Sequence, residues 1–234
     1  LARLLAVSGS GWQAPCRRAR SLREPRHRSG QVDPGLAFKQ VAGGFLVQDR
    51  DVGRLAASDL KVVTRRHPTQ AELDDLQLVW HFIGPIQSNK TRDLATCFDW
   101  VHSVDRLKIA QRLSEQRPPT LAPLQVCIQV NVDGGPTKSG VQPQDLPALA
   151  QAVAALPRLQ LRGLMTIPEP ADSPEQMRAE HRQAKALFDQ LCRQGLPLDT
   201  LSMGMSADME AAIHAGSTMV RVGTAIFGGR PRPI

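Results

Sequence analysis

The stretch Leu201-Ser202-Met203-Gly204-Met205-Ser206-Ala207-Asp208-Met209-Glu210-Ala211-Ala212-Ile213 decides the fold of this chain. Its first five residues, 201–205, are mostly apolar and predict a short buried β-strand. Ser206 is a residue type that commonly caps helices, and it predicts a helix over residues 207–215 that ends at Gly216. A strand that leads directly into a helix is the unit from which parallel α/β folds are built.

The same alternation continues on both sides of that stretch. Apolar runs predict strands, amphipathic or Ala/Leu-rich runs predict helices, and Asp105 and Gly195 are expected to cap two of the helices. The predicted strands cover residues 4–8, 76–83, 100–104, 124–132, 159–167 and 218–227, and the further predicted helices cover 106–115, 144–156 and 173–195. About six such units indicate a parallel α/β sheet closed as a (β/α)8 barrel of the TIM type.

One segment does not follow this pattern. The net charge is +7, and residues 9–70 carry the whole excess, with twelve Lys or Arg against five Asp or Glu. Residues 9–35 are rich in Gly, Pro, Ser and Arg without strand or helix periodicity, so we expect loop or disorder there. We therefore expect one domain over residues 1–234, with an anomalous segment at 9–70 and incomplete early strands.

Composition excludes several classes of protein. No run approaches the roughly 18 apolar residues that a membrane helix needs, so we expect no membrane span. The four cysteines are far apart and form no CxxC pair, so we expect no metal site. We expect a cytoplasmic monomer.

Two strand ends in the C-terminal half are suited to an anion. Active sites in (β/α)8 barrels lie at the carboxyl ends of the strands, and phosphates often sit beside the last two. Gly204, Met205 and Ser206 end one predicted strand and open a helix, whose free N–H groups attract anions. Gly223 and Thr224 add a closely approachable backbone and a hydroxyl. Each feature alone also fits a structural role, with Ser206 as a helix cap and Gly223 as a packing residue.

Three motifs resemble the pyridoxal 5'-phosphate (PLP) homeostasis family. They are residues 80–90 (WHFIGPIQSNK), 201–213 (LSMGMSADMEAAI) and 216–228 (GSTMVRVGTAIFG), and shorter matches lie at 138–140 and 162–165. The resemblance runs from about residue 72 to 230.

The resemblance implies a barrel like the N-terminal domain of alanine racemase, with PLP bound as a Schiff base to a lysine. It also implies that Ser206, Gly223 and Thr224 hold the phosphate, with Gly204 and Met205 beside them in the same motif. Arg221 would face the pyridine nitrogen. His81 and Asn89 belong to the motif near the cofactor face, although a histidine in an apolar strand is more often a core residue.

The chain departs from the family at its start. Residues 5–8 (LAVS) resemble the family strand LAVSK, but Gly9 stands where the Schiff-base lysine is expected. The family motif GENYVQE is also absent between residues 9 and 72. A shifted reading frame or misassembled gene, a divergent insertion and an Arg-rich targeting segment each remain open as explanations. We therefore expect PLP binding to be weak and non-covalent at best, and the function of the family to be impaired in this chain.

Three functions compete on this basis. The first is non-catalytic PLP binding in vitamin B6 homeostasis. The second is an amino-acid racemase, which needs a second domain and a tyrosine acid/base, but the chain has no tyrosine and its length leaves no room for that domain. The third is nucleic-acid binding through the arginines of residues 17–28, which no recognition motif or aromatic platform accompanies, so we expect a solvated basic loop.

Overall fold

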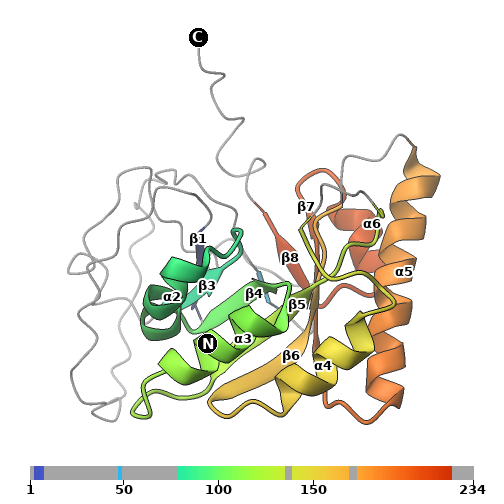
Figure 1. Cartoon of the computed structure of the whole chain (residues 1–234). Coiled ribbons are helices and arrows are strands. Elements are labelled where there is room, and N and C mark those ends of the chain that lie inside the picture. The colour runs from blue at the N-terminus through green and yellow to red at the C-terminus, as the bar shows by residue number, and fades with distance from the viewer. Residues whose placement is uncertain (1–2, 8–46, 49–77, 135–138, 169–172, 223–234) are drawn as a thin grey trace, which may run out of the picture.

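The computed structural model of the chain describes residues 3–7, 47–48, 78–134, 139–168 and 173–222 (Figure 1). The predictions for residues 9–46 and 49–70, and the predicted phosphate ligands Gly223 and Thr224, lie outside these residues.

Eight strands form one curled sheet. Its order is β1-β3-β4-β5-β6-β7-β8-β2, and all neighbours are parallel except β2, which is antiparallel to β8. The strands are β1 (Arg3–Val7), β2 (Val47–Gln48), β3 (Leu78–Phe82), β4 (Trp100–Val104), β5 (Leu124–Gln129), β6 (Leu159–Met165), β7 (Thr200–Met205) and β8 (Met219–Arg221). The predicted α/β class and barrel-type sheet are confirmed, as is the strand at the start of the chain.

The two edges of the sheet are not paired to each other. Among the described residues, no ladder joins β1 to β2. β1 pairs with β3, with Leu5 opposite Trp80, so it occupies the place of a first barrel strand. The described part is thus a curled sheet with two edges, and the expectation of incomplete early strands stays a prediction.

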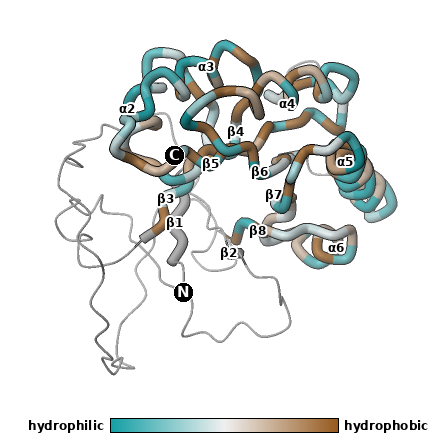
Figure 2. The backbone as a smooth tube through the Cα atoms, turned by 90° about the horizontal axis from the view of Figure 1, so that it is seen from below, coloured by the Kyte–Doolittle hydropathy of each residue, from teal (hydrophilic) through white to brown (hydrophobic). Residues whose placement is uncertain are grey.

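The helices cover the outer side of this sheet, as Figure 2 shows. They are a 3-10 turn η2 (Ser88–Lys90), α2 (Thr91–Cys97), α3 (Leu107–Gln116), α4 (Leu146–Ala154), α5 (Pro174–Arg193) and α6 (Met209–His214). The larger apolar cluster lies between sheet and helices and includes Phe98, Ile109, Leu124 and Leu191. A smaller cluster, formed by Ile83, Trp100, Cys127, Met165 and Met219, comes from four strands and from Ile83, which directly follows β3. These strand residues fill the concave side of the sheet, which is where a barrel has its interior.

Two predicted helix caps are wrong by a few residues. Ser206 does not cap α6, because residues 206–208 form a turn and Asp208 is the residue before the helix. Asp105 does not cap α3, because Arg106 holds that position and the Asp105 carboxylate accepts from the Arg106 guanidinium instead. Ser173, for which no cap was predicted, does cap α5, since its Oγ accepts from the N–H of Gln176 at 3.1 Å.

In the part of the chain that the structure describes, no helix is both long enough and apolar enough to cross a bilayer.

Candidate functional site

Arg221 is the central residue of the candidate site. It ends β8, and only 3% of its surface is exposed. Its Nη1 donates to the backbone oxygen of Ser202 at 2.8 Å and to the Ser202 hydroxyl at 2.9 Å, and its Nη2 donates to the backbone oxygen of Thr166 at 2.6 Å. Contacts to β7 and to the end of β6 therefore fix the plane of the guanidinium at the carboxyl edge of three neighbouring strands.

One nitrogen of the Arg221 guanidinium has no partner. This is the buried Nε, which makes no hydrogen bond among the described residues. Burial lowers the pKa of Arg221 to about 10, and the carboxylate of Asp208 acts in the opposite direction. Arg221 is thus a cation at neutral pH whose buried Nε–H is not accepted by any described residue, and such a group favours an acceptor from a ligand.

The turn between β7 and α6 lies next to Arg221. Met205 is the register partner of Arg221 across the β7–β8 pair. Gly204 takes φ +92°, a left-handed conformation, and a Cβ added there would lie 2.5 Å from the Cβ of Ala212. Glycine is therefore required both by the backbone and by the close approach of α6 to the strand. Ser206 follows within this turn and is half-buried.

His81 is buried in β3 and belongs to a ring cluster inside the sheet. Its Nδ1 lies 2.8 Å from Nε2 of His102 on β4, and its ring stacks on Trp100 with centroids 5.0 Å apart. Burial, and then the charge of His102, hold the pKa of His81 well below its usual range. Burial, and then the charge of Arg221, lower the pKa of His102 to about 3. Both imidazoles are therefore neutral at physiological pH.

The predicted site residues thus fall into three places. Gly204, Met205, Ser206 and Arg221 come together at adjacent strand ends. His81 lies in the interior of the sheet, whereas Asn89 is exposed in η2, after β3. The remaining two, Gly223 and Thr224, lie outside the described residues.

Sequence reasoning missed three polar residues of the interior. Ser202 and Thr166 hold Arg221, and His102 pairs with His81. The sequence signal that could have identified them is the alternation of side chains along a strand, which places every second residue on the same face. By this rule Trp100 and His102 share one face of β4, although the strand is mostly apolar. A strand buried on both faces hides such residues, because its hydrophobic run is nearly continuous.

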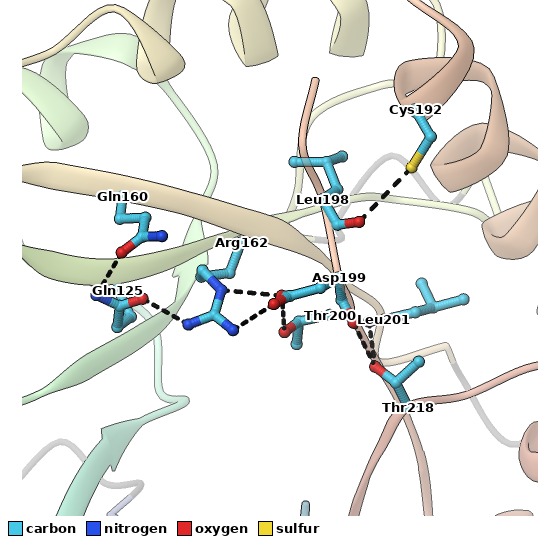
Figure 3. Close-up of polar contacts among 9 residues, drawn as sticks. All are labelled: Gln125, Gln160, Arg162, Cys192, Leu198, Asp199, Thr200, Leu201 and Thr218. Carbon is cyan, nitrogen blue, oxygen red and sulfur yellow. Dashed lines mark hydrogen bonds and ion pairs between the residues drawn. The ribbon is translucent and has the colours of Figure 1, made fainter. Parts of the chain in front are cut away.

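The opposite end of the same strands carries a different polar group (Figure 3). Arg162 of β6 forms a two-pronged contact with Asp199, just before β7, and its Nη1 donates to Oε1 of Gln125 at 2.7 Å. Its guanidinium carbon also lies 4.9 Å from the ring centroid of Trp100. Because Asp199 and Gln125 are at or near the amino ends of their strands, this cluster joins strands at the face of the barrel where residues serve stability.

The described residues contain no group of three or more His, Cys, Asp or Glu side chains arranged to hold a metal ion.

This combination of fold and site defines the alanine racemase N-terminal domain class, whose sequence profile matches residues 67–231. An alanine racemase structure from Clostridium difficile 630 has a TM-score of 0.59 at 20% identity over 70% of this chain and 43% of that chain, so it shows the shared fold. The chain belongs to the pyridoxal phosphate homeostasis protein family, as its curated relatives demonstrate. It is 65% identical over 161 residues to the protein of that name from Pseudomonas aeruginosa, which is 69% of each chain. It is 56% identical over 159 residues to the one from Escherichia coli K12, which is 68% of each chain.

A solved relative with cofactor belongs to the same group. The structure of PipY from Synechococcus elongatus with PLP bound has a TM-score of 0.62 at 40% identity, and the match covers 68% of this chain and 75% of that one.

A second sequence profile matches the anomalous segment. Residues 19–92 match the AICARFT/IMPCHase bienzyme family. The match covers less than a third of the chain and does not assign the whole chain to that family. The matched range also includes residues 80–90, which belong to one of the three motifs described above.

Proposed function

We propose that this chain binds pyridoxal 5'-phosphate without covalent attachment and serves vitamin B6 homeostasis without catalysing a reaction. Membership of the family and the PLP-bound PipY structure support the choice of ligand. The observation that carries the proposal is the buried Arg221, with one N–H that no described residue accepts.

The chemistry of Arg221 fits the pyridine ring of PLP. Its Nε–H can donate only to an acceptor, and an unprotonated ring nitrogen is one. A permanent cation beside that nitrogen also disfavours its protonation. When bound, PLP supplies an electron sink, which ring protonation strengthens. Arg221 thus favours a muted, carrier-like site over a catalytic one.

The turn after β7 is suited to the phosphate. We propose that Ser206, Gly223 and Thr224 bind it, with Gly204 and Met205 shaping the backbone. The register of Met205 opposite Arg221 supports this assignment, because it puts both parts of the site at one sheet edge. His81 and Asn89 are proposed to lie on the cofactor side, since both belong to one family motif.

The absence of a covalent link rests on the sequence. Ser8 is followed by Gly9, where the family strand continues with lysine. A Schiff-base lysine must be desolvated and aimed at the aldehyde. None of the lysines among the described residues is buried, and Lys90 is exposed in η2.

A titration with PLP, followed by borohydride reduction and peptide mass spectrometry, tests both parts of the proposal. We expect saturable PLP retention in ultrafiltration and no pyridoxyl-lysine after reduction. Arg221→Gln is expected to weaken retention at least about tenfold, which corresponds to the loss of a hydrogen bond to a charged group. A single labelled lysine would overturn the non-covalent assignment, and a lack of saturable retention by the unmodified protein would overturn the function itself.

A racemase is the alternative function within the same fold. The chain contains no tyrosine, so the usual acid/base partner is missing. We expect no interconversion of L- and D-alanine in the presence of added PLP.

A further inference from the structure

We propose that His181 of α5 is a positioning residue, which holds the phosphate-binding turn in shape through Asp208. This inference rests on the proposed PLP site and names a further residue for it, from a helix that none of the three family motifs covers.

The geometry links three elements through one carboxylate. His181 is buried, with 1% of its side chain exposed, and its Nε2 lies 3.0 Å from Oδ2 of Asp208, a close polar contact without the alignment of a hydrogen bond. The other oxygen, Oδ1, accepts from the backbone N–H of Met205 at 2.6 Å. Asp208 therefore connects α5 to the end of β7, across the turn that contains Ser206.

Backbone contacts show that Asp208 also closes this turn. Its N–H donates to the Met205 oxygen at 3.2 Å, and its own oxygen accepts from the N–H of Ala212 at 3.0 Å. Met205 and Asp208 are thus bonded to each other twice, once through backbone and once through side chain. The direction of the backbone at Ser206, which lies between them, follows from this closure.

The negative charge of Asp208 gives the contact with His181 a second role. Burial alone would raise the pKa of Asp208, but the contacts from His181 and from the Met205 N–H outweigh it and lower the pKa below its usual range. Asp208 is therefore an anion close to a site that must receive another anion. His181 contacts this carboxylate on one side, and on the other side the carboxylate acts on the charge of Arg221. Without His181, the carboxylate would be free to turn toward the phosphate and repel it.

The prediction is specific to the phosphate end of the ligand. PLP and pyridoxal share the ring and the aldehyde, and only PLP carries the phosphate. The dissociation constants of both ligands can be measured by ultrafiltration for the unmodified chain and its variants. We expect His181→Leu to weaken PLP binding about tenfold, as the loss of a contact to a charged group would, and to leave pyridoxal binding unchanged.

A conservative variant provides the matched control. His181→Gln puts an amide N–H2 near the place of Nε2, so it is expected to retain PLP affinity within about twofold of the unmodified protein. His181→Asn is too short to reach Asp208 and is expected to behave like His181→Leu. This Gln and Asn pair carries the test if the leucine variant fails to fold, because both amides are polar and differ in reach.

The outcomes separate this inference from the proposed function. If the unmodified protein does not retain PLP, the proposed site is wrong. If it retains PLP and the leucine and asparagine variants bind it equally well, His181 is not a positioning residue. A further readout needs no ligand: hydrogen exchange at the Met205 amide is expected to be about tenfold faster in His181→Asn than in His181→Gln. Equal exchange in these two variants would overturn the inference.

Discussion

Nδ1 of His81 lies 2.8 Å from Nε2 of His102, and the outer nitrogen of each ring has no partner among the described residues. Because both rings are neutral, one donates its single N–H to the other. The pair therefore always leaves one N–H and one lone pair at its two ends. This buried pair lies inside the sheet. The ring of His102 stacks on Trp100, and the charge of Arg221 contributes to the lowered pKa of His102.

The pair predicts a loss of stability in mild acid. Unfolded His102 takes up a proton near pH 6.5, whereas folded His102 stays neutral down to about pH 3. The unfolded state therefore binds more protons in this window, and the free energy of unfolding falls as the pH falls, by up to ~1.4 kcal/mol per pH unit for each such histidine. Urea unfolding between pH 7 and 4.5 measures this slope.

His102→Gln is expected to reduce that slope, because one buried neutral histidine is removed. The control is His214→Gln, which changes a histidine with 78% of its side chain exposed and is expected to keep the original slope. A His102→Gln protein with an unchanged slope would show that the buried pair does not resist protonation.

Gly163 in the middle of β6 is predicted to tolerate no side chain. A Cβ at this position would lie 1.7 Å from the backbone oxygen of Thr200, its register partner on β7. Since a strand has to move, we expect Gly163→Ala to lower the free energy of unfolding by about 3–5 kcal/mol or to prevent folding. Gly195→Ala is the control: its φ of +91° is strained, but a Cβ there meets nothing within 4 Å, so about 1 kcal/mol is expected. Similar losses in the two variants by chemical unfolding would contradict the close approach of β6 and β7.

The sequence predicted the strands better than the ends of the helices. β4 covers the predicted residues, and β5, β6 and β7 differ from prediction by one to three residues at their ends, because apolar runs bounded by turn residues mark buried strands clearly. The first residue of a helix is harder to predict, because several neighbouring side chains can each act as its cap. At α6, Ser206 and Asp208 both have capping side chains, and the contacts of Asp208 with His181 and Met205 place it at the helix start. Such long-range partners cannot be read from local sequence.

The candidate site was predictable only where a motif carried it. The turn at Gly204 was predicted from a strand that leads into a helix, the role of Arg221 was implied by the resemblance, and the structure brings both to one edge. The short helix α2 was not predicted, since its seven residues, TRDLATC, are too few for an amphipathic period to stand out. His181 was missed because α5 reads as an ordinary amphipathic helix, and nothing local marks one buried histidine as a partner of a distant loop.

Cys127 is predicted to be inert toward thiol reagents in the folded protein. It is fully buried in β5, and burial raises the pKa of its thiol beyond its usual range. The thiolate is the reactive form, so alkylation by iodoacetamide at pH 8 should be slow until the protein unfolds. Cys192 on α5 is half-buried and is the internal comparison. Peptide mass spectrometry of native and urea-treated protein measures both, and labelling of native Cys127 at the rate of Cys192 would contradict its burial.

Arg162 is predicted to stabilise the fold without affecting the ligand. Figure 3 shows its contacts with Asp199 and Gln125. Together with the contact to Trp100, they tie β4, β5, β6 and the start of β7 at the end of the sheet opposite Arg221. The ion pair is partly exposed, with 21% and 36% of the two side chains accessible, so its contribution is limited by solvent screening. We expect Arg162→Ala to lower the free energy of unfolding by about 1–2 kcal/mol, from the lost paired hydrogen bonds and the cation–π contact. Arg162→Lys keeps the charge but not the planar fork, so it should recover less than half of that loss.

PLP retention is expected to be unchanged in both variants. A loss of retention with unchanged stability would mean that this end of the sheet takes part in ligand binding, against the division of the barrel into a binding end and a stabilising end.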